Sequence, residues 1–253
     1  ALSEAVKLAP SRPELALRLG NIHLQRNDIP AALKAFEHIG RIAAMKPAGL
    51  DIEPLYEAAV HLRALGHADQ AIQLLKAAAR YLPAPETGDE SPELASQTPA
   101  DPILPGDEGI SQADAVKIWT ELAGTYQEIQ DLPAALEALE QAVLLTPFSS
   151  YLYLSRADYL LQLGRTSLAQ MSLQEALSLG FSDAGSCYLA SRLLSRLNDL
   201  PAALEYAEKT VAARPQDPGL RVRSAVLASE LAWSLLDIEK AFAFLKDIGT
   251  ERI

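Results

Sequence analysis

A short pattern of polar and apolar positions recurs along the chain and predicts its helices. The six residues Asp-Ile/Leu-Pro-Ala-Ala-Leu occur at 28–33, 131–136 and 199–204. Each copy follows a helix-like stretch that ends in Asn or Gln, and each leads into a second helix-like stretch. A recurring unit of this kind indicates one supersecondary module copied along the chain, so we expect an array of helix pairs and not a single globule.

The period of the array follows from the small residue inside each copy. The inner alanines of the strong and weak copies are Ala32, Ala71, Ala135, Ala169, Ala203 and Ala241. The spacing from Ala135 to Ala169, and again to Ala203, is 34 residues. Most of the others are slightly longer, and the spacing of 64 between Ala71 and Ala135 equals one period plus 30 residues. The chain therefore holds about six copies and one insertion.

Thirty-four residues is the period of the tetratricopeptide repeat, and the residues inside the copies resemble that family. The segment 116–149 matches best, and it has the following residues at the family's Trp, Leu, Tyr, Ala, Phe, Ala and Pro positions: Trp119, Leu122, Tyr126, Ala135, Leu139, Ala142 and Pro147. The resemblance covers nearly the whole chain except 84–112. It implies an all-α fold, a right-handed α-solenoid of about six tetratricopeptide-like helix-turn-helix repeats with one acidic Pro-rich insertion.

The chemistry of one unit explains these residue choices. Asp131 can accept hydrogen bonds from backbone N–H groups at the start of the second helix. Pro133 then lies in the first turn, where a missing N–H costs nothing. The alanines are expected at the crossing of the paired helices, where a small side chain lets the backbones approach. Since neither helix buries its apolar stripe alone, stacking of the pairs should create the core.

The array is expected to have three parts. Residues 1–83 form N-terminal repeats, the first of them truncated, and 113–253 form C-terminal repeats. Residues 84–112 carry seven of the chain's eleven net negative charges, with five prolines and no Lys or Arg. This composition is typical of a solvated spacer, although the segment could instead dock on the array or a partner through Ile103 and Leu104. Because residues 1–10 resemble the end of a second helix, we expect a fragment of a longer protein or a processed chain.

Composition excludes several classes of protein and site. Cys187 is the single cysteine, so the chain has no intrachain disulfide and no cysteine metal cluster, and its repeat position predicts a buried role. No run of 18 apolar residues occurs, which argues against membrane insertion. The net charge of −11 and the lack of a Lys/Arg-dense stripe argue against nucleic-acid binding. The sequence leaves the location open, with the cytoplasm favoured.

No catalytic pattern is present in the sequence. The four histidines show no His-Glu-x-x-His spacing, and no glycine-rich phosphate loop exists. His23 takes a repeat position that is normally an aromatic packing slot. We therefore predict no enzymatic activity, no catalytic residues, no cofactor and no metal site.

The resemblance places binding on the first helix of each pair, whose exposed positions line the concave groove in this family. Chaperone-binding members grip a peptide's C-terminal carboxylate with Lys, Asn and Arg side chains at such positions. Here Asn21 matches, but Leu17, Glu57 and Glu121 replace required residues. Binding of a C-terminal tail in that way is therefore not expected. In the last copy the lining positions hold Arg223, Val226, Leu227, Glu230 and Trp233.

Aromatic and arginine side chains tend to carry interface energy, and they gather at the lining positions after residue 150. The candidate partner-binding residues are Tyr151, Leu154, Tyr188, Arg192, Arg196 and Arg223. The competing interpretation is that the tyrosines pack between repeats and the arginines are only solvated.

The function expected from the resemblance is a protein-interaction scaffold that binds a protein or peptide segment in the groove. It could be one part of a larger multi-subunit assembly. Two alternatives stay open: a regulatory or substrate-recruiting module of an enzyme encoded elsewhere in the full-length chain, and a self-associating structural repeat.

Overall fold

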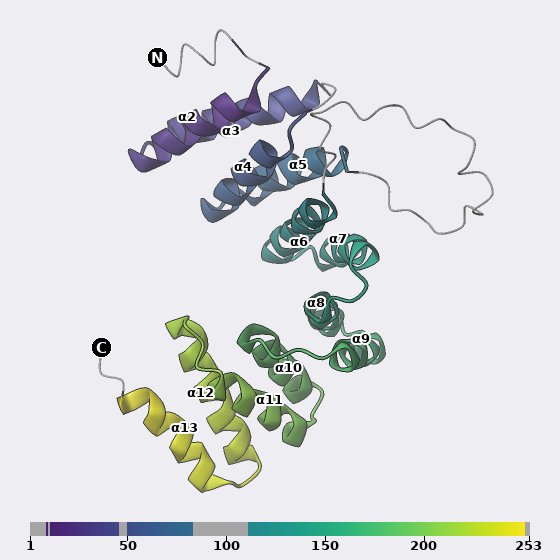
Figure 1. The fold of residues 1–253 in the computed structure, drawn as a ribbon, viewed down its shortest axis with the longest axis vertical. Helices are drawn as coiled ribbons and strands as arrows, with labels where there is room; N and C mark the ends of the chain where they lie inside the picture. Colours follow the sequence, from purple (N-terminus) through teal and green to yellow (C-terminus); the bar gives the residue numbers. More distant parts are fainter. Residues whose placement is uncertain (1–8, 10, 46–49, 83–110, 251–253) are drawn as a thin grey trace, which may run out of the picture. The chain divides into compact units, whose positions relative to one another are not determined.

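The structure, a computed structural model, describes residues 9, 11–45, 50–82 and 111–250, and in these residues every regular element is an α-helix (Figure 1). The helices are α2 (Pro13–Gln25), α3 (Ile29–Ala44), α4 (Glu53–Ala64), α5 (Ala68–Ala79), α6 (Gln112–Glu128), α7 (Leu132–Leu145), α8 (Ser150–Gln162), α9 (Thr166–Leu179), α10 (Ala184–Arg196), α11 (Leu200–Ala212), α12 (Pro218–Ser234) and α13 (Ile238–Thr250). The predicted all-α helical repeat fold is therefore confirmed.

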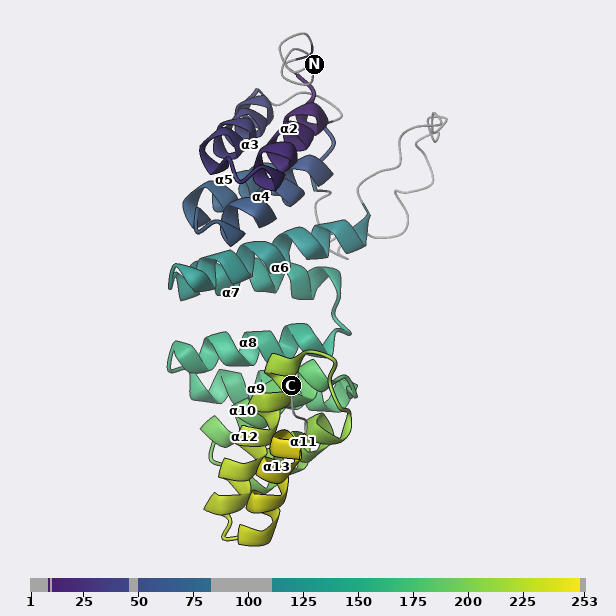
Figure 2. The ribbon, with the colours of Figure 1, turned by 90° about the vertical axis from the view of Figure 1, so that its left-hand side faces the viewer.

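Consecutive helices pack as hairpins, and the hairpins group into two compact units, Ala1–Thr146 and Pro147–Ile253. The N-terminal unit contains α2/α3, α4/α5 and α6/α7, which follow one another as a stack in Figure 2. The C-terminal unit contains α8/α9, α10/α11 and α12/α13. Within each unit the first helix of one hairpin packs on the first helix of the next.

Most of the predicted domain boundaries fall outside the residues that the structure describes. The truncated copy at 1–10 and residues 83–110 of the insertion are outside the described residues. The described chain resumes at Ser111, whose hydroxyl caps α6 by accepting from the Asp114 N–H at 3.1 Å. The division into 1–83, 84–112 and 113–253 therefore stays a proposal.

The turn inside each hairpin has one left-handed residue, and in four of the six described hairpins the next residue is an aspartate that caps the second helix. The left-handed residues, with φ between 57° and 81°, are Asn27, Gly66, Gln130, Gly164, Asn198 and Leu236. Three of the next residues are the predicted aspartates Asp28, Asp131 and Asp199, and each accepts from a backbone N–H three residues later at 3.3 Å. Glycine and asparagine tolerate this backbone conformation best. The predicted cap at Asp131 is confirmed.

Small residues lie at the helix crossing on both sides. The six inner alanines are 0–3% exposed. Twelve residues before them, on the first helices, are Gly20, Ala59, Ala123, Ala157, Ser191 and Ser229. Ser191 Oγ donates to the carbonyl of Ala203 at 2.7 Å, and Ser229 Oγ does the same to Ala241 at 3.0 Å. These bonds cross from one helix to the other, so the two backbones approach closely at this level.

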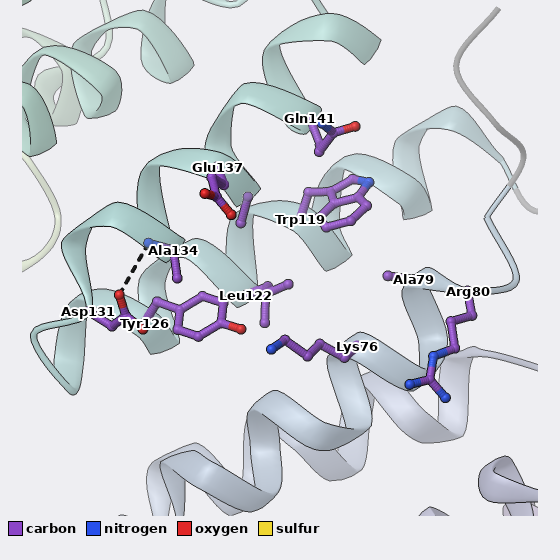
Figure 3. A pocket seen from close by; sticks show the side chains of 11 residues that line it. Lys76, Ala79, Arg80, Trp119, Leu122, Tyr126, Asp131, Ala134, Glu137 and Gln141 are labelled. Atoms are coloured by element: carbon purple, nitrogen blue, oxygen red, sulfur yellow. Dashed lines mark hydrogen bonds between the residues drawn. The ribbon is translucent and has the colours of Figure 1, made fainter.

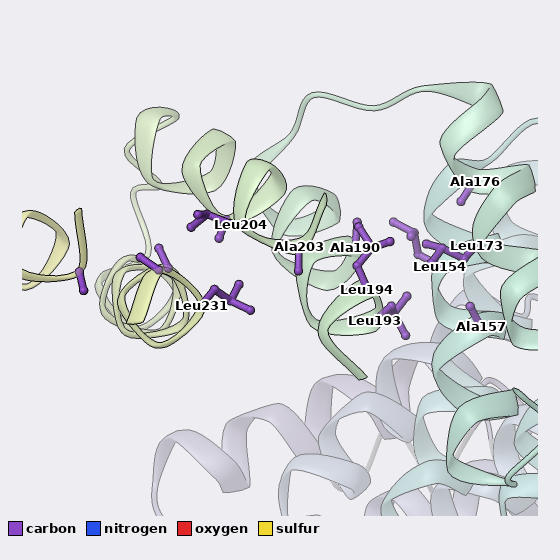
Figure 4. Close-up of a cluster of buried hydrophobic side chains, with 14 residues drawn as sticks. Leu154, Ala157, Leu173, Ala176, Ala190, Leu193, Leu194, Ala203, Leu204 and Leu231 are labelled. Atoms are coloured by element: carbon purple, nitrogen blue, oxygen red, sulfur yellow. The ribbon is translucent and has the colours of Figure 1, made fainter. Parts of the chain in front are cut away.

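The core of the C-terminal unit is a continuous cluster of leucines and alanines from all six of its helices (Figure 4). Leu154, Leu173 and Leu193 fill the space between the first two hairpins, and Leu204 and Leu231 extend the cluster into the last one. Their burial is shared between hairpins. Removing one hairpin would therefore expose the apolar face of its neighbour.

Gly20 is a tightly packed crossing position. A Cβ atom added there would lie 2.4 Å from Phe36 Cε1. Phe36 is fully buried and its ring stacks on His61 with 5.8 Å between the ring centroids, so it has little room to move. We predict that Gly20→Ala lowers the free energy of unfolding by about 1–2 kcal/mol through overpacking. Urea denaturation followed by circular dichroism would measure this.

Gly40→Ala is the matched control, since Gly40 also lies inside a helix but its added Cβ meets only Leu74 Cδ2 at 3.4 Å. This control should be neutral or gain up to about 1 kcal/mol from helix propensity. Equal stability of the two variants would contradict the close crossing at Gly20.

Candidate functional site

The first helices of the C-terminal unit, α8, α10 and α12, lie next to one another, because α10 packs against both α8 and α12. Their outward positions therefore form neighbouring strips of surface. All six predicted partner-binding residues belong to these three helices. The structure brings three of the six together, uses one in an ion pair, buries one and leaves one apart.

Tyr188, Arg192 and Arg223 form what we call the arginine–tyrosine cluster. Arg192 lies one turn after Tyr188 on α10, and its guanidinium carbon is 5.9 Å from the centre of the tyrosine ring. Arg223 comes from α12, with its guanidinium carbon 5.8 Å from the same centre. Both arginines are exposed and Tyr188 is half-buried. The quadrupole of the ring attracts both cations and holds them at one place on the surface.

The cations of this cluster are only weakly neutralised. Arg223 donates from Nε to the carbonyl of Gly219 at 3.2 Å, and its Nη2 lies 3.7 Å from Asp217 Oδ2 in an exposed pair. Arg192 has no ion pair among the described residues. The cluster therefore presents positive charge beside an aromatic ring in a chain whose net charge is −11.

Arg196 has a structural contact that the sequence did not reveal. Its Nη1 donates to Asp158 Oδ1 at 2.9 Å, across from α10 to α8. Gln162 Nε2 donates to the other oxygen of the same carboxylate at 2.7 Å. The Asp158 side chain is only 11% exposed, so its charge depends on these partners. Arg196 therefore ties two first helices together, and its guanidinium is already occupied.

The prediction that Leu154 offers apolar contact to a partner is wrong. Leu154 is 0% exposed and belongs to the core cluster of the C-terminal unit. The reason is that Leu154 belongs to a core cluster to which both α9 and α10 contribute side chains. A partner cannot reach it while the unit is folded.

Tyr151 is 56% exposed on α8, and no ring contact or ion pair connects it to the arginine–tyrosine cluster among the described residues. Two residues on α12 are exposed apolar side chains that were placed on the groove lining but not in the binding set. Val226 is 38% exposed and Trp233 is 57% exposed. Sequence periodicity did not reveal that these two side chains are exposed. Both lie on α12, the first helix of the hairpin α12/α13.

The N-terminal unit shows the same use of arginine between first helices. Arg63 on α4 donates to Glu121 at 2.7 Å and to Glu128 at 2.8 Å on α6. Burial alone would lower the pKa of the Arg63 guanidinium, but its hydrogen bonds to the two carboxylates raise the pKa above its ordinary value. Burial and then the charge of Glu121 raise the pKa of the nearby Tyr56. On the first helices of the N-terminal unit, Arg63 and the two glutamates thus pair with each other.

A pocket of about 620 Å³ lies where α5, α6 and α7 meet in the same unit (Figure 3). Trp119, Tyr126, Lys76 and Arg80 are among its lining residues. Lys76 reaches toward Tyr126, with Nζ 5.3 Å from the centre of the ring. The sequence placed Trp119 and Tyr126 at packing positions of the repeat and did not predict a pocket beside them.

His23 and Cys187, the side chains weighed for catalytic or metal-binding roles, have contacts typical of structural residues. His23 Nδ1 lies 3.2 Å from Asp28 Oδ2, beside the turn between α2 and α3. Cys187 is buried as predicted, and burial together with the charge of Asp183 raises the pKa of its thiol. Within the described residues no group of three His, Cys, Asp or Glu side chains is placed to hold a metal ion. No helix in the described part of the chain is both long and apolar enough to cross a membrane.

A sequence profile described as "Tetratricopeptide repeat" matches residues 1–42, 120–184 and 154–218, which together make up more than half of the chain. A comparison with curated proteins gave no match.

Solved structures with a similar fold include three bacterial proteins. A tetratricopeptide repeat protein from Parabacteroides merdae is 13% identical with a TM-score of 0.61, covering 95% of this chain and 80% of that one. PilF of Pseudomonas aeruginosa is 17% identical with a TM-score of 0.56, covering 92% and 88%. A thermophilic tetratricopeptide repeat protein of Thermus thermophilus is 23% identical with a TM-score of 0.50, covering 85% and 98%. These similarities concern the fold.

The ion pair of Arg196 and the solvated charge of Arg192 allow a matched comparison on one helix. We predict that Arg196→Ala lowers the stability of the C-terminal unit by about 1–2 kcal/mol, because it leaves the Asp158 carboxylate short of a donor. Arg192→Ala should change stability by less than about 0.5 kcal/mol. Hydrogen exchange in α8 and α10 would show the difference, and equal protection in both variants would contradict the structural role of Arg196.

Proposed function

The chain belongs to the tetratricopeptide repeat family, and we propose that it is a protein-interaction scaffold whose C-terminal unit binds a partner segment over the arginine–tyrosine cluster. Proteins of this family generally bind other proteins through the surface of their repeats. For this chain we further propose the binding site and the chemistry of the segment that it recognises. The observation that carries it is the pair of exposed arginines whose guanidinium carbons lie 5.9 and 5.8 Å from the centre of one tyrosine ring.

The cluster suits a segment that offers a carboxylate next to an apolar side chain. Guanidinium groups form strong bidentate hydrogen bonds with carboxylates. Tyr188 supplies a rigid aromatic surface beside the two cations, and tyrosine and arginine are among the side chains that most often carry interface energy. Because Arg192 and Arg223 already contact the ring before binding, little side-chain conformational freedom needs to be lost on association.

Apolar contact would come from the neighbouring positions of α12. Val226 lies one turn after Arg223 on that helix, and Trp233 is two further turns along. Both are more exposed than the buried Leu154 that the sequence favoured. The proposed binding set is therefore Tyr188, Arg192 and Arg223, with Val226 and Trp233 as apolar neighbours and Tyr151 as a peripheral residue.

The charge of the surface favours a protein segment over nucleic acid as the partner. Two arginines around one ring make a local positive site and not the extended basic stripe that a phosphate backbone needs. The acidity of the chain adds a long-range repulsion of nucleic acid.

The test is a double substitution, Tyr188→Ala with Arg192→Glu. Immobilised wild-type chain would capture partners from a lysate, and the affinity of the captured partner would then be measured by calorimetry. We expect the double variant to bind about 30- to 1000-fold more weakly, which corresponds to a loss of about 2–4 kcal/mol.

Arg165→Glu is the matched control, because it reverses the charge of an exposed arginine in the turn before α9. It should retain wild-type affinity. If the folded double variant also retains it, the binding site lies elsewhere. Loss of helicity in the double variant would show that Tyr188 serves packing and would count against its role in binding.

A further inference from the structure

The pocket between α5, α6 and α7 has a floor and two walls, each from one face of a helix. The floor is formed by Trp119, Leu122 and Tyr126 of α6, which are spaced by three and four residues and so share one side of that helix. Figure 3 shows these side chains between the pocket residues of α5 and those of α7. Since Trp119 and Tyr126 are seven residues apart, the floor is about 10 Å long, the length of about three residues of extended chain.

The pocket is open because a small residue stands where other hairpins have a large one. Ala138 lies three residues after the inner alanine of α7. In the other hairpins that follow a hairpin of the same unit, the equivalent residues are Leu74 of α5, Tyr206 of α11 and Phe244 of α13. Leu74 is 3% exposed, and Tyr206 and Phe244 pack against the core cluster of the C-terminal unit. An alanine at this position leaves the space of such a side chain empty.

The packing of α5 on α3 shows what the missing side chain would contact. Leu74 Cδ2 lies 3.4 Å from the place of a Cβ atom added at Gly40 of α3. Gly40 and Ala79 are equivalent, since each follows the inner alanine of its helix by eight residues. Ala79 and Ala138 both line the pocket, so a leucine side chain between them would repeat a contact that exists one hairpin earlier. The volume of about 620 Å³ is in the usual range of ligand pockets.

Trp119 is a ring left partly uncovered at a core position. Its equivalents in the other hairpins of this kind are Leu55, Cys187 and Ala225, which are 0%, 2% and 3% exposed. Trp119 itself is half-buried and lines the pocket. Its indole offers a large apolar surface on which a ligand side chain can be buried.

Opposite charges stand on the two walls. Lys76 and Arg80 are on the α5 wall, and Asp131 and Glu137 are on the α7 wall. Lys76 contacts the ring of Tyr126, and Asp131 caps α7. Arg80 and Glu137 are exposed, and neither has an ion pair among the described residues. The charges open to a ligand are therefore a cation on one wall and a carboxylate on the other.

The open rim favours a segment of protein chain over a small molecule. The four charged residues of the walls are all exposed, whereas a small ligand needs most of its surface covered. A segment in the polyproline II form has three residues per turn, so three consecutive side chains point in three directions. One side chain can then reach the floor while its two neighbours reach the two walls.

We propose that this pocket is a second binding site, separate from the arginine–tyrosine cluster, for a segment with an apolar residue between an acidic and a basic one. A side chain of leucine or aromatic size enters between Ala79 and Ala138 and packs on Trp119. The acidic neighbour binds Arg80, and the basic neighbour binds Glu137. One buried side chain and two exposed ion pairs give a weak site, with a dissociation constant on the order of 0.1–1 mM for an isolated segment.

The probe is a blocked peptide, acetyl-Gly-Ser-Glu-Leu-Lys-Ser-Gly-amide, titrated into isotope-labelled chain and followed by NMR. The chain has two tryptophans, Trp119 in the pocket and Trp233 on α12, so their indole N–H signals report separately on the two proposed sites. We expect the Trp119 signal to move and to saturate. No saturable movement of that signal up to about 5 mM peptide, or movement of the Trp233 signal alone, would overturn the proposal and leave the arginine–tyrosine cluster untouched.

Ala138→Leu supplies the missing side chain from the chain itself. It should weaken peptide binding more than tenfold and keep or raise the temperature of unfolding, since Leu74 is accommodated at the equivalent position. Alanine in place of the peptide's leucine should weaken binding to the wild-type chain by about tenfold or more. If folded Ala138→Leu binds the peptide as tightly as wild type, the peptide does not occupy this pocket.

A pair of matched variants tests the acidic contact, whether or not Ala138→Leu folds. Arg80→Gln should weaken binding of the peptide about two- to fivefold and should not affect a peptide with Gln in place of Glu. Arg41→Gln is the control, because Arg41 is the exposed equivalent of Arg80 on α3 and does not line the pocket. It should leave the binding of both peptides unchanged. Equal effects of Arg80→Gln on the two peptides would exclude the proposed pairing.

Discussion

The close crossing of two helices at a pair of small residues is the contact on which each hairpin depends. At Gly20 the crossing leaves no space for a single methyl group beside Phe36, and at Ser191 a hydroxyl reaches the backbone of the opposite helix. A fixed crossing fixes the rotation of both helices about their axes. It therefore decides which side chains enter the core, which meet the next hairpin and which remain on the outer surface.

Polar residues on the first helices have two uses that compete. Arg63 binds two glutamates of the next first helix, and Arg196 binds Asp158 of the previous one. These bonds hold neighbouring hairpins in register and occupy the guanidinium groups. Arg192 and Arg223 lack strong partners of this kind and instead share the ring of Tyr188. On the surface of the first helices, the arginines open to a partner are therefore Arg192 and Arg223, which are not held in strong ion pairs between hairpins.

Features decided inside one hairpin could be predicted from the sequence. The cap at Asp131, the turn residues before the caps and the small residues at the crossing depend on contacts within a few residues or between paired helices. The exposure of a first-helix position depends on the neighbouring hairpin. Leu154 and Val226 are equivalent in the repeat, yet the first is buried in the core cluster while the second is 38% exposed. Periodicity gives both the same face and cannot tell them apart.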